Sequence, residues 1–218
     1  MINILIADDH PIFRKGIAEV ISDGLMDVNI DHVSNGLEAV ELLLENDYQF
    51  VVLDIDMPEK DGLETLVWIK EKGLSTKVII LTMFKEDEIF NTAWMNKVDG
   101  FLLKDHSGNE VLKCIEELTL GKRYIGAGLE SKMQEHGKYV KEQREIAEKL
   151  DGLTQAEKKT LKLVAENNSS SQIADKLFIT SKSVENYRSR ICKKMGIAPG
   201  NNSLMRWALE HKSLFKNL

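Results

Sequence analysis

The sequence predicts two domains of different class, an α/β domain with a parallel sheet followed by a smaller all-helical domain. Residues 1–121 alternate five short apolar runs with five stretches of helical spacing, a pattern typical of strands joined by crossover helices. From residue 151 onward, apolar residues recur only at helical spacing. The charge also changes sign, because residues 1–121 hold 24 Asp and Glu against 10 Lys and Arg, whereas residues 151–218 hold 6 against 12. We therefore expect domains at 1–121 and 151–218, joined by a linker at 122–150.

In the first domain, we expect a strand wherever an apolar run ends at turn residues. The five expected strands are Ile2–Ala7, Val28–Val33, Phe50–Leu53, Lys77–Thr82 and Asp99–Lys104. Apolar residues between and after them, beginning with Ile12 and Ile17, repeat every three or four positions and indicate five helices. The third run is apolar throughout, as in strands covered on both faces. Right-handed crossovers and the strand order 2-1-3-4-5 then give a doubly wound, five-stranded parallel sheet.

Acidic side chains follow the two strands that this order places side by side. Asp8 and Asp9 end the first strand, and Asp54 ends the third. Open parallel sheets bind their ligands outside the carboxyl ends of the strands, at the point where the strand order reverses. Three carboxylates in one crevice repel one another unless a cation joins them, and oxygen ligands with phosphoryl chemistry suit Mg²⁺. We therefore predict that Asp54 accepts a phosphoryl group at a magnesium site.

Two further strand ends carry groups that suit a phosphoryl site. Thr82 offers a hydroxyl and Lys104 a cation, which the phosphoryl oxygens need as donors and for charge neutralisation. Phe101 lies three residues before Lys104, so alternation places it on the opposite side of the strand. Considered alone, each residue has an ordinary structural explanation. Asp54 would be a turn residue, Thr82 a strand residue, Lys104 a solvated charge and Phe101 a core residue. Their combined order favours the phosphoryl site.

The phrases that carry these residues resemble the receiver domain of bacterial response regulators, in particular the NarL/FixJ subgroup. They are Ala7-Asp8-Asp9-His10-Pro11, Asp54-Ile55-Asp56-Met57-Pro58 and Gly100-Phe101-Leu102-Leu103-Lys104-Asp105. The resemblance covers residues 1–121 and implies a flavodoxin-like fold.

The resemblance also implies a mechanism. Asp54 would take its phosphoryl group from the phosphohistidine of a sensor histidine kinase. Thr82 would then move toward the phosphoryl group, Lys104 would bind it, and Phe101 would swing inward behind Thr82. The metal ligands that the resemblance implies for Mg²⁺ are Asp8, Asp9, Asp54 and the backbone carbonyl of Asp56.

Some positions depart from the receiver pattern. Asp105 follows the lysine where many receivers have proline, and Met83 stands where a smaller residue is common, which could restrict access to the phosphoryl group. Lys97 stands where these proteins often have glycine near the end of the fourth helix. Asn96 is then the residue that we expect to adopt a left-handed helix cap.

The linker, 122–150, shows no strand pattern. Gly126–Gly128 is flexible by composition, and Tyr139–Leu150 has helical spacing on one side with charges on the other. A solvated spacer without a fixed conformation is the alternative.

The sequence of the second domain predicts a helix-turn-helix motif. Thr154 and Glu157 form a capping box at one helix start, and Asn167-Asn168 can end that helix. Ser169–Ser171 caps a second helix, and Thr180 or Ser181 a third, which buries Val184, Tyr187, Ile191 and Met195. The outer face of this third helix is polar and basic, as expected for a helix that enters the major groove.

Leu153-Thr154, Ser171-Gln172-Ile173-Ala174, and Ser183–Tyr187 continuing to Gly196, resemble the LuxR-type DNA-binding domain over residues 151–215. Glu185 and Tyr187 depart from the family's usual lysine and histidine, which leaves the sequence preference open. Candidate DNA-binding residues are Lys182, Ser183, Glu185, Asn186, Arg188, Ser189, Arg190, Lys193 and Lys194. By the same resemblance, a helix from Ser203 to Lys212 supports dimerisation, and Leu204, Trp207 and Ala208 are its candidate apolar contacts.

The chain therefore reads as a two-component response regulator, a transcription regulator rather than an enzyme, that binds DNA and forms a homodimer when phosphorylated. Two alternatives are a haloacid-dehalogenase-like aspartyl phosphatase, suggested by Asp54-Ile55-Asp56, and a regulator that binds DNA without phosphorylation. The order of the acidic motifs argues against the phosphatase, since those enzymes place Asp-x-Asp on the first strand. Nothing at the N-terminus resembles a signal peptide, no apolar stretch reaches membrane-spanning length, and Cys114 and Cys192 lie far apart. We expect a cytoplasmic protein.

Overall fold

The computed structural model describes residues 1–198, 200, 202–211 and 215. It divides into two compact units, Met1–His136 and Gly137–Leu218. This division falls inside a helix, within the predicted linker, and the domain bounds 1–121 and 151–218 stay a prediction.

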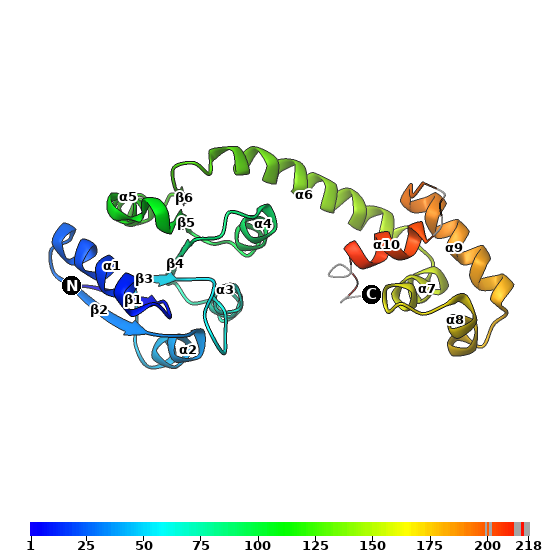
Figure 1. The fold of residues 1–218 in the computed structure, drawn as a ribbon, viewed down its shortest axis with the longest axis horizontal. Coiled ribbons are helices and arrows are strands. Elements are labelled where there is room, and N and C mark those ends of the chain that lie inside the picture. The colour runs from blue at the N-terminus through cyan, green and yellow to red at the C-terminus, as the bar shows by residue number, and fades with distance from the viewer. Residues whose placement is uncertain (199, 201, 212–214, 216–218) are drawn as a thin grey trace. The chain divides into compact units, whose positions relative to one another are not determined.

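The first unit is a parallel sheet with helices on both faces (Figure 1). The sheet has the order β2-β1-β3-β4-β5-β6 and every pair in it is parallel. Its strands are β1 (Ile2–Ala7), β2 (Val28–Val33), β3 (Phe50–Leu53), β4 (Lys77–Thr82), β5 (Gly100–Leu103) and β6 (Tyr124–Ile125). Its helices are α1 (Pro11–Gly24), α2 (Gly36–Glu45), α3 (Gly62–Glu71), α4 (Asp87–Met95) and α5 (Ser107–Thr119). The predicted α/β fold and the relative order of its five strands are confirmed.

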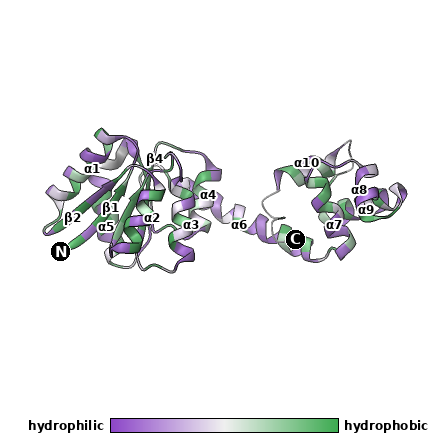
Figure 2. Ribbon diagram, turned by 90° about the horizontal axis from the view of Figure 1, so that it is seen from below, coloured by the Kyte–Doolittle hydropathy of each residue, from purple (hydrophilic) through white to green (hydrophobic). Residues whose placement is uncertain are grey.

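Two apolar clusters cover the two faces of the sheet, and Figure 2 shows the apolar strands between helices of mixed hydropathy. α2, α3 and α4 supply Leu43, Leu66 and Phe90 to one cluster. α1 and α5 supply Ile17 and Ile115 to the other. The strands carry side chains into both, which explains why β3 is apolar at every position.

The fifth strand is shorter than predicted, because Asp99 lies outside it and Lys104 begins a 3-10 helix, Lys104–His106. Three further details of the first unit differ from the prediction. A sixth strand, β6, pairs Tyr124 and Ile125 with β5, and two residues are too short to show a period in the sequence. Ile12 is 89% exposed rather than part of the buried stripe of α1, because the five positions from Ile12 to Ile17 place it on a different side of the helix from Ile17 and Ile21. The left-handed residue after α4 is Lys97 (φ +59°), whereas Asn96 (φ −82°) is the helix cap without that conformation.

The linker helix α6 runs from Glu130 to Asp151, so it begins nine residues before the predicted start at Tyr139. Its early residues are mostly charged or polar, so no apolar stripe marks them in the sequence. His136 is nevertheless buried, and its Nδ1–H donates to Oδ1 of Asn91 on α4 over 2.6 Å. Ile146 and Leu150 are buried in the core of the second unit.

The second unit is all helical, with α7 (Gln155–Ala165), α8 (Ser170–Leu177), α9 (Ser181–Met195) and α10 (Ser203–Glu210). Each predicted start is confirmed: capping boxes join Thr154 to Glu157 and Ser169 to Gln172, and the Thr180 hydroxyl accepts from the Ser183 amide. Asn167 (φ +63°) follows α7 in the left-handed conformation. Lys212, to which the last helix was predicted to extend, lies outside the described residues.

Among the described residues, no helix is both long and apolar enough to cross a membrane.

Candidate functional site

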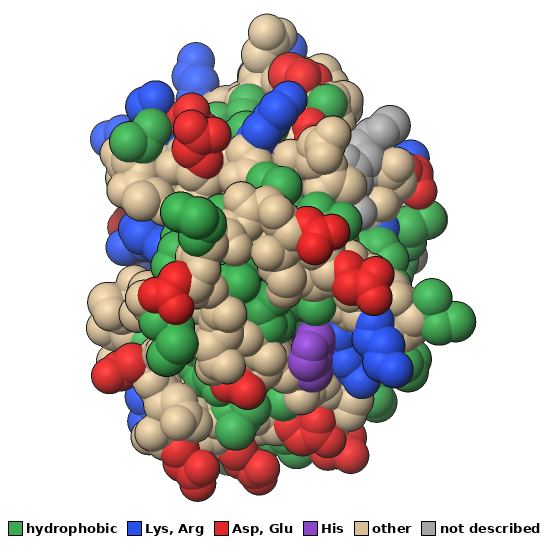
Figure 3. Space-filling model, turned by 90° about the vertical axis from the view of Figure 1, so that its left-hand side faces the viewer, with side chains coloured by type: hydrophobic (Ala, Val, Ile, Leu, Met, Phe, Trp, Pro, Cys, Tyr) green, Lys and Arg blue, Asp and Glu red, His purple; other side chains and the backbone are tan. Residues whose placement is uncertain are grey.

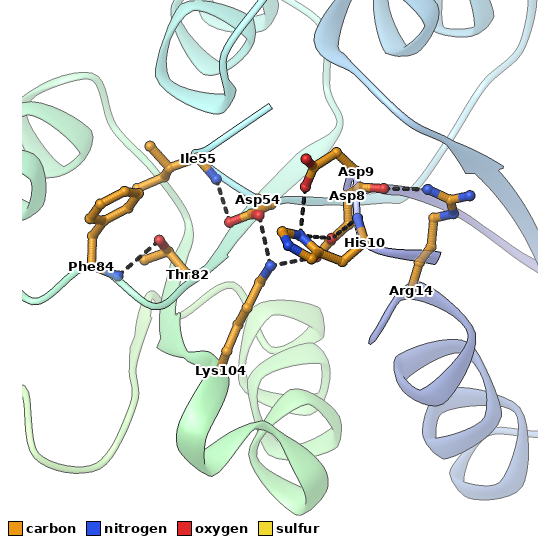
Figure 4. A network of polar contacts seen from close by, with 9 residues as sticks. All are labelled: Asp8, Asp9, His10, Arg14, Asp54, Ile55, Thr82, Phe84 and Lys104. Atoms are coloured by element: carbon orange, nitrogen blue, oxygen red, sulfur yellow. Dashed lines mark hydrogen bonds and ion pairs between the residues drawn. The ribbon is translucent and has the colours of Figure 1, made fainter. Parts of the chain in front are cut away.

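Three carboxylates meet at the carboxyl end of the sheet, as the strand order predicted (Figure 4). β1 and β3 lie side by side with Ala7 opposite Leu53, so the residues that follow them share one edge. Asp8 and Asp54 are 3% and 4% exposed, and Asp9 is exposed. The burial of two carboxylates so close together requires a compensating positive charge.

Lys104, which directly follows β5, supplies that charge. Its Nζ lies 2.7 Å from Oδ2 of Asp8 and 2.7 Å from Oδ2 of Asp54. Burial still raises the pKa of Asp54, because it outweighs the hydrogen bond and charge of Lys104. Burial acts to lower the pKa of Lys104, but its bonds to Asp54 and Asp8 outweigh that effect and leave this pKa raised. Asp54, the candidate phosphoacceptor, therefore lies beside the ammonium group of Lys104, which these contacts hold in place.

Backbone amides hold the two buried carboxylates in place. The Ile55 amide donates to Oδ1 of Asp54, and the His10 amide donates to Oδ1 of Asp8, both over 2.8 Å. Gly62, at the start of α3, approaches the Asp54 carbonyl so closely that a Cβ there would lie 2.0 Å from its oxygen. A side chain at residue 62 would therefore displace the loop behind Asp54.

The donor set fits a hard divalent cation. Carboxylate oxygens of Asp8, Asp9 and Asp54 lie within 4.8 Å of one another, together with a ring nitrogen of His10. Nδ1 of His10 lies 2.6 Å from Oδ1 of Asp9, an ion pair when the ring is protonated. Asp56, whose backbone carbonyl was the fourth predicted ligand, follows in the loop after β3, and its side chain is exposed. Mostly oxygen donors, one of them on the exposed Asp9, are the environment that Mg²⁺ prefers.

Thr82 and Phe101 occupy the predicted strands but do not both face the carboxylates. Thr82 ends β4, fully buried, and its hydroxyl accepts from the Phe84 amide over 3.1 Å. Phe101 is 1% exposed and packs edge-on against Phe90 of α4, with ring centroids 5.2 Å apart. Phe101 belongs to the apolar cluster on one face of the sheet, whereas Lys104 Nζ lies over the ring of Phe13, which packs against the cluster on the other face. Lys104 itself lies just beyond β5, so the alternation argument does not extend to it.

Ring contacts continue from Phe101 to the linker helix. Phe90 stacks on Trp94 at 5.5 Å, and both meet the His136 ring edge-on, at 6.2 and 6.5 Å. The Arg123 guanidinium lies 3.5 Å above the Trp94 ring. No pattern in the sequence points to this cluster, because its members come from α4, β5, α6 and the segment before β6.

An apolar pocket beside the carboxylates was also missed. It has a volume of about 360 Å³ and is lined by His10, Ile12, Phe13, Met83 and Lys104. Nζ of Lys104 lies 4.6 Å from the centre of the Phe13 ring. Met83 is 57% exposed, so it forms part of the pocket wall rather than a closed cover.

The outer face of α9 is polar and basic, as expected for a helix that binds DNA. Val184, Ile191 and Met195 are buried and Tyr187 is half-buried, which turns the opposite side of the helix outward. Six of the predicted DNA-binding residues are exposed on this face. They are Lys182, Glu185, Asn186, Ser189, Arg190 and Lys193. Ser183 and Arg188 are half-buried.

Lys194 differs from the other candidates because its Nζ bonds Oε2 of Glu157 over 2.7 Å and the Gly152 carbonyl over 3.1 Å. Glu157 is 2% exposed and the Lys194 side chain 40% exposed, so the contact joins a buried carboxylate to a lysine at the surface of the domain.

The predicted dimer contacts lie mostly inside their own domain. Leu204 and Ala208 are 3% and 0% exposed, and both belong to the core that includes α7 and α9. Trp207 is half-buried and stacks on His211 at 4.5 Å. Leu209, which the sequence did not single out, is 47% exposed on α10. The outward surface of α10 therefore consists largely of other residues than the three predicted.

Acidic side chains are spread over the face of the molecule that Figure 3 shows and gather along its lower edge, in keeping with the acidic composition of residues 1–121.

Two family models match the chain. Residues 4–116 match the response regulator receiver domain, and residues 151–202 match the bacterial regulatory proteins of the LuxR family.

Relatives along nearly the whole chain include the nitrate/nitrite response regulator protein NarL of Escherichia coli (strain K12). The two are 31% identical over 193 residues, which is 88% of each chain. A LuxR-family DNA-binding response regulator from Staphylococcus aureus, solved as a crystal structure, is 36% identical, with a TM-score of 0.52 over 54% of this chain and 98% of that chain. The RcsB response regulator of Salmonella typhimurium has the same fold at 23% identity, with a TM-score of 0.60 over 95% of this chain and 98% of that chain.

Proposed function

This chain belongs to the response regulators of the NarL/FixJ subgroup, and on that premise we propose that a phosphoryl group on Asp54 controls DNA binding by the helix-turn-helix domain. The observation that carries the proposal is the place of Asp54, a buried carboxylate between two further aspartates and a lysine. The donor is the phosphohistidine of a sensor histidine kinase.

In the transfer, a carboxylate oxygen of Asp54 attacks the phosphorus in line with the leaving imidazole. The P–N bond breaks as the P–O bond forms, and the imidazole leaves neutral after taking up a proton. Lys104 Nζ, already 2.7 Å from Oδ2 of Asp54, moves with little displacement to a phosphoryl oxygen. The chain acts on itself, so we expect one transfer and slow hydrolysis rather than turnover of an outside substrate.

A Mg²⁺ ion held by Asp9, Asp54 and the Asp56 carbonyl, with Asp8 assisting, would neutralise charge on the phosphoryl oxygens. The amide of Ile55 donates to Oδ1 of Asp54 and so helps to fix the orientation of the carboxylate. Asp8 and Asp9 repel an incoming phosphoryl group in the absence of the cation, so phosphorylation is expected to require it.

We propose that Thr82 is the residue that responds to the phosphoryl group by hydrogen bonding to it. Its hydroxyl now accepts from the Phe84 amide, and it would turn to donate to a phosphoryl oxygen instead. Thr82 is paired with Leu103, two residues after Phe101 on β5, and we expect its rotation to change the packing of the Phe101 ring. That ring packs on Phe90, which in turn contacts His136 of α6. The ring cluster is thus a physical connection between the phosphoryl site and the linker helix.

The output is DNA binding by α9 in the major groove. Lys182, Arg190 and Lys193 are exposed and provide phosphate or base contacts, while Asn186 and Glu185 can bond base edges. We propose that phosphorylation favours a homodimer that reads two half-sites. The cytoplasmic location stays a prediction.

The first experiment is intact mass of the wild type and of Asp54→Asn after incubation with acetyl phosphate and Mg²⁺. One phosphoryl group on the wild type alone supports the assignment, and Asp56→Asn is the matched control that should still be phosphorylated. DNA binding by both states is then compared on the same duplexes. Equal affinity of the phosphorylated and unphosphorylated protein would overturn the control that we propose, and steady release of phosphate would instead indicate an enzyme.

A further inference from the structure

Phe178, in the turn between α8 and α9, is 93% exposed and adopts a left-handed backbone conformation (φ +54°, ψ +47°). The turn does not need the aromatic ring. The Phe178 amide bonds the Asp175 carbonyl over 3.4 Å, and the Ile179 amide bonds the Ala174 carbonyl over 3.0 Å. Backbone groups therefore close the end of α8, and the ring projects into solvent.

The same domain ends two other helices with a left-handed residue, and both are of a type that tolerates this conformation. Asn167 (φ +63°) follows α7, and Gly196 (φ +72°) follows α9. A bulky side chain is disfavoured there, because its Cβ crowds the following carbonyl. Phe178 thus carries a backbone cost that Gly or Asn would avoid, together with the exposure of a large apolar ring. Single exposed apolar residues are common, but this combination at one turn is not.

The position of the turn indicates what the ring meets. Phe178 lies three residues before Ser181, the first residue of α9, and the N-terminal end of a recognition helix is the part that contacts base edges. Exposed lysines stand on either side of the turn, Lys176 at the end of α8 and Lys182 at the start of α9. The exposed Asp175 offsets part of this charge, but the turn adjoins the proposed recognition helix, so DNA is the partner that we expect to approach it.

We propose that Phe178 is a specificity residue that packs on the C5-methyl group of a thymine at the edge of each half-site. The thymine methyl is the apolar group that the major groove displays, and Phe is among the side chains that contact it. This inference rests on the DNA-binding function proposed above. It adds a base preference carried by the turn rather than by the outer face of α9.

The test begins with duplexes selected from a random-sequence pool by the wild-type protein treated with acetyl phosphate and Mg²⁺. Affinity for the selected duplex is then measured for the wild type, Phe178→Gly and Phe178→Leu. Each thymine of the duplex is replaced in turn by deoxyuridine, which removes only the methyl group. Asn167→Gly, at the other helix end with the same conformation, is the matched control for changes in the turn backbone.

We expect Phe178→Gly to bind roughly tenfold more weakly and Phe178→Leu to keep most of the affinity, since a buried apolar contact is lost only in the first. At one thymine per half-site, removal of the methyl group should lower the affinity of the wild type about fourfold. The same replacement should leave the affinity of Phe178→Gly unchanged. The salt dependence should not change, because no phosphate contact is removed. The melting temperature of Phe178→Gly should rise, which separates lost contact from lost folding.

Unchanged affinity of Phe178→Gly would overturn the inference while leaving DNA binding by α9 in place. Equal losses of affinity on deoxyuridine replacement in the wild type and Phe178→Gly would also overturn it, because the methyl contact would then not come from Phe178. Selection of no duplex by the wild type would overturn the proposed DNA-binding function itself.

Discussion

Nζ of Lys104 lies 2.7 Å from Oδ2 of Asp54, so the proposed phosphoacceptor is paired with a cation before any phosphoryl group arrives. The pair is 7% and 4% exposed, and the same Nζ also reaches Asp8. A lysine in this place can stabilise the cluster of carboxylates and later bind the transferred phosphoryl group. These two roles can be separated by experiment.

Lys104→Met should destabilise the first domain, because it leaves two buried carboxylates without their cation. Removal of one partner from a buried ion pair costs about 3 kcal/mol. Added Mg²⁺ should restore part of the loss. Urea unfolding with Mg²⁺ and with a chelator measures both effects. The control is Lys85→Met, whose pair with Asp105 is 58% and 40% exposed and should contribute little. Equal stability of Lys104→Met and wild type would contradict the account.

Asp54→Asn should stabilise the metal-free protein at neutral pH. Burial raises the pKa of Asp54 in the folded state, so the folded protein holds its proton at pH values where the unfolded chain has lost it. The carboxylate therefore costs stability as pH rises above its ordinary range, and the amide does not. The difference in unfolding free energy between variant and wild type should be present at pH 7 and shrink toward pH 4. Denaturant titrations in a chelator measure it, and a difference independent of pH would argue against the burial effect.

Lys97→Gly should stabilise the first domain by about 1 kcal/mol, because Lys97 adopts φ +59° after α4. Lys97→Ala keeps the Cβ and should give no such gain. Thermal or urea unfolding distinguishes the two variants. A gain for alanine equal to that for glycine would show that the lysine charge, not the backbone, is responsible.

Residue types and periodicity could predict the sheet, because strands and their carboxyl ends depend on local patterns. The same patterns placed Asp54, Asp8 and Lys104 at one edge, and the structure brings them together. The position of the left-handed residue could not be predicted by residue type. Asn96 tolerates that conformation better than Lys97, but the register of α4 decides which residue follows its last turn.

Tertiary contacts account for the other differences. His136 is buried because α6 packs on α4, and a histidine among charged residues carries no sign of this in the sequence. Leu204 and Ala208 have the spacing of an apolar face, but periodicity does not say whether that face meets its own domain or a second copy. In the structure it meets its own domain.

His136 should make the first unit, Met1–His136, less stable below about pH 6.5. Burial lowers its pKa, and the nearby charge of Arg123 lowers it further. The unfolded chain therefore takes up the proton first as pH falls, and stability decreases through that range. Burial also lowers the pKa of His32, so the comparison is made with His136→Gln, which keeps a donor for Asn91 but does not titrate. The variant should lose less stability between pH 7.5 and 5.5 than the wild type. An identical loss would assign the pH dependence to other groups.

Lys193 and Lys194 are neighbours on α9, and the structure predicts different consequences when each is removed. Lys193 is exposed, so Lys193→Ala should weaken DNA binding, with a salt slope shallower by about 1 and no change in stability. Lys194 bonds the buried carboxylate of Glu157, whose pKa stays low because these bonds outweigh its burial. Lys194→Ala leaves that carboxylate without its cation and should cost about 1 to 3 kcal/mol of domain stability.

The double variant Glu157→Gln, Lys194→Ala should recover part of that loss, because it removes both charges. Urea unfolding and DNA titration over a range of salt concentrations, applied to all four proteins, separate the two lysines. A lower salt slope for Lys194→Ala with unchanged stability would mean that Lys194 leaves Glu157 to bind a phosphate when DNA is present. In that case the helix would contribute both lysines to the interface, and the ion pair would belong only to the free protein.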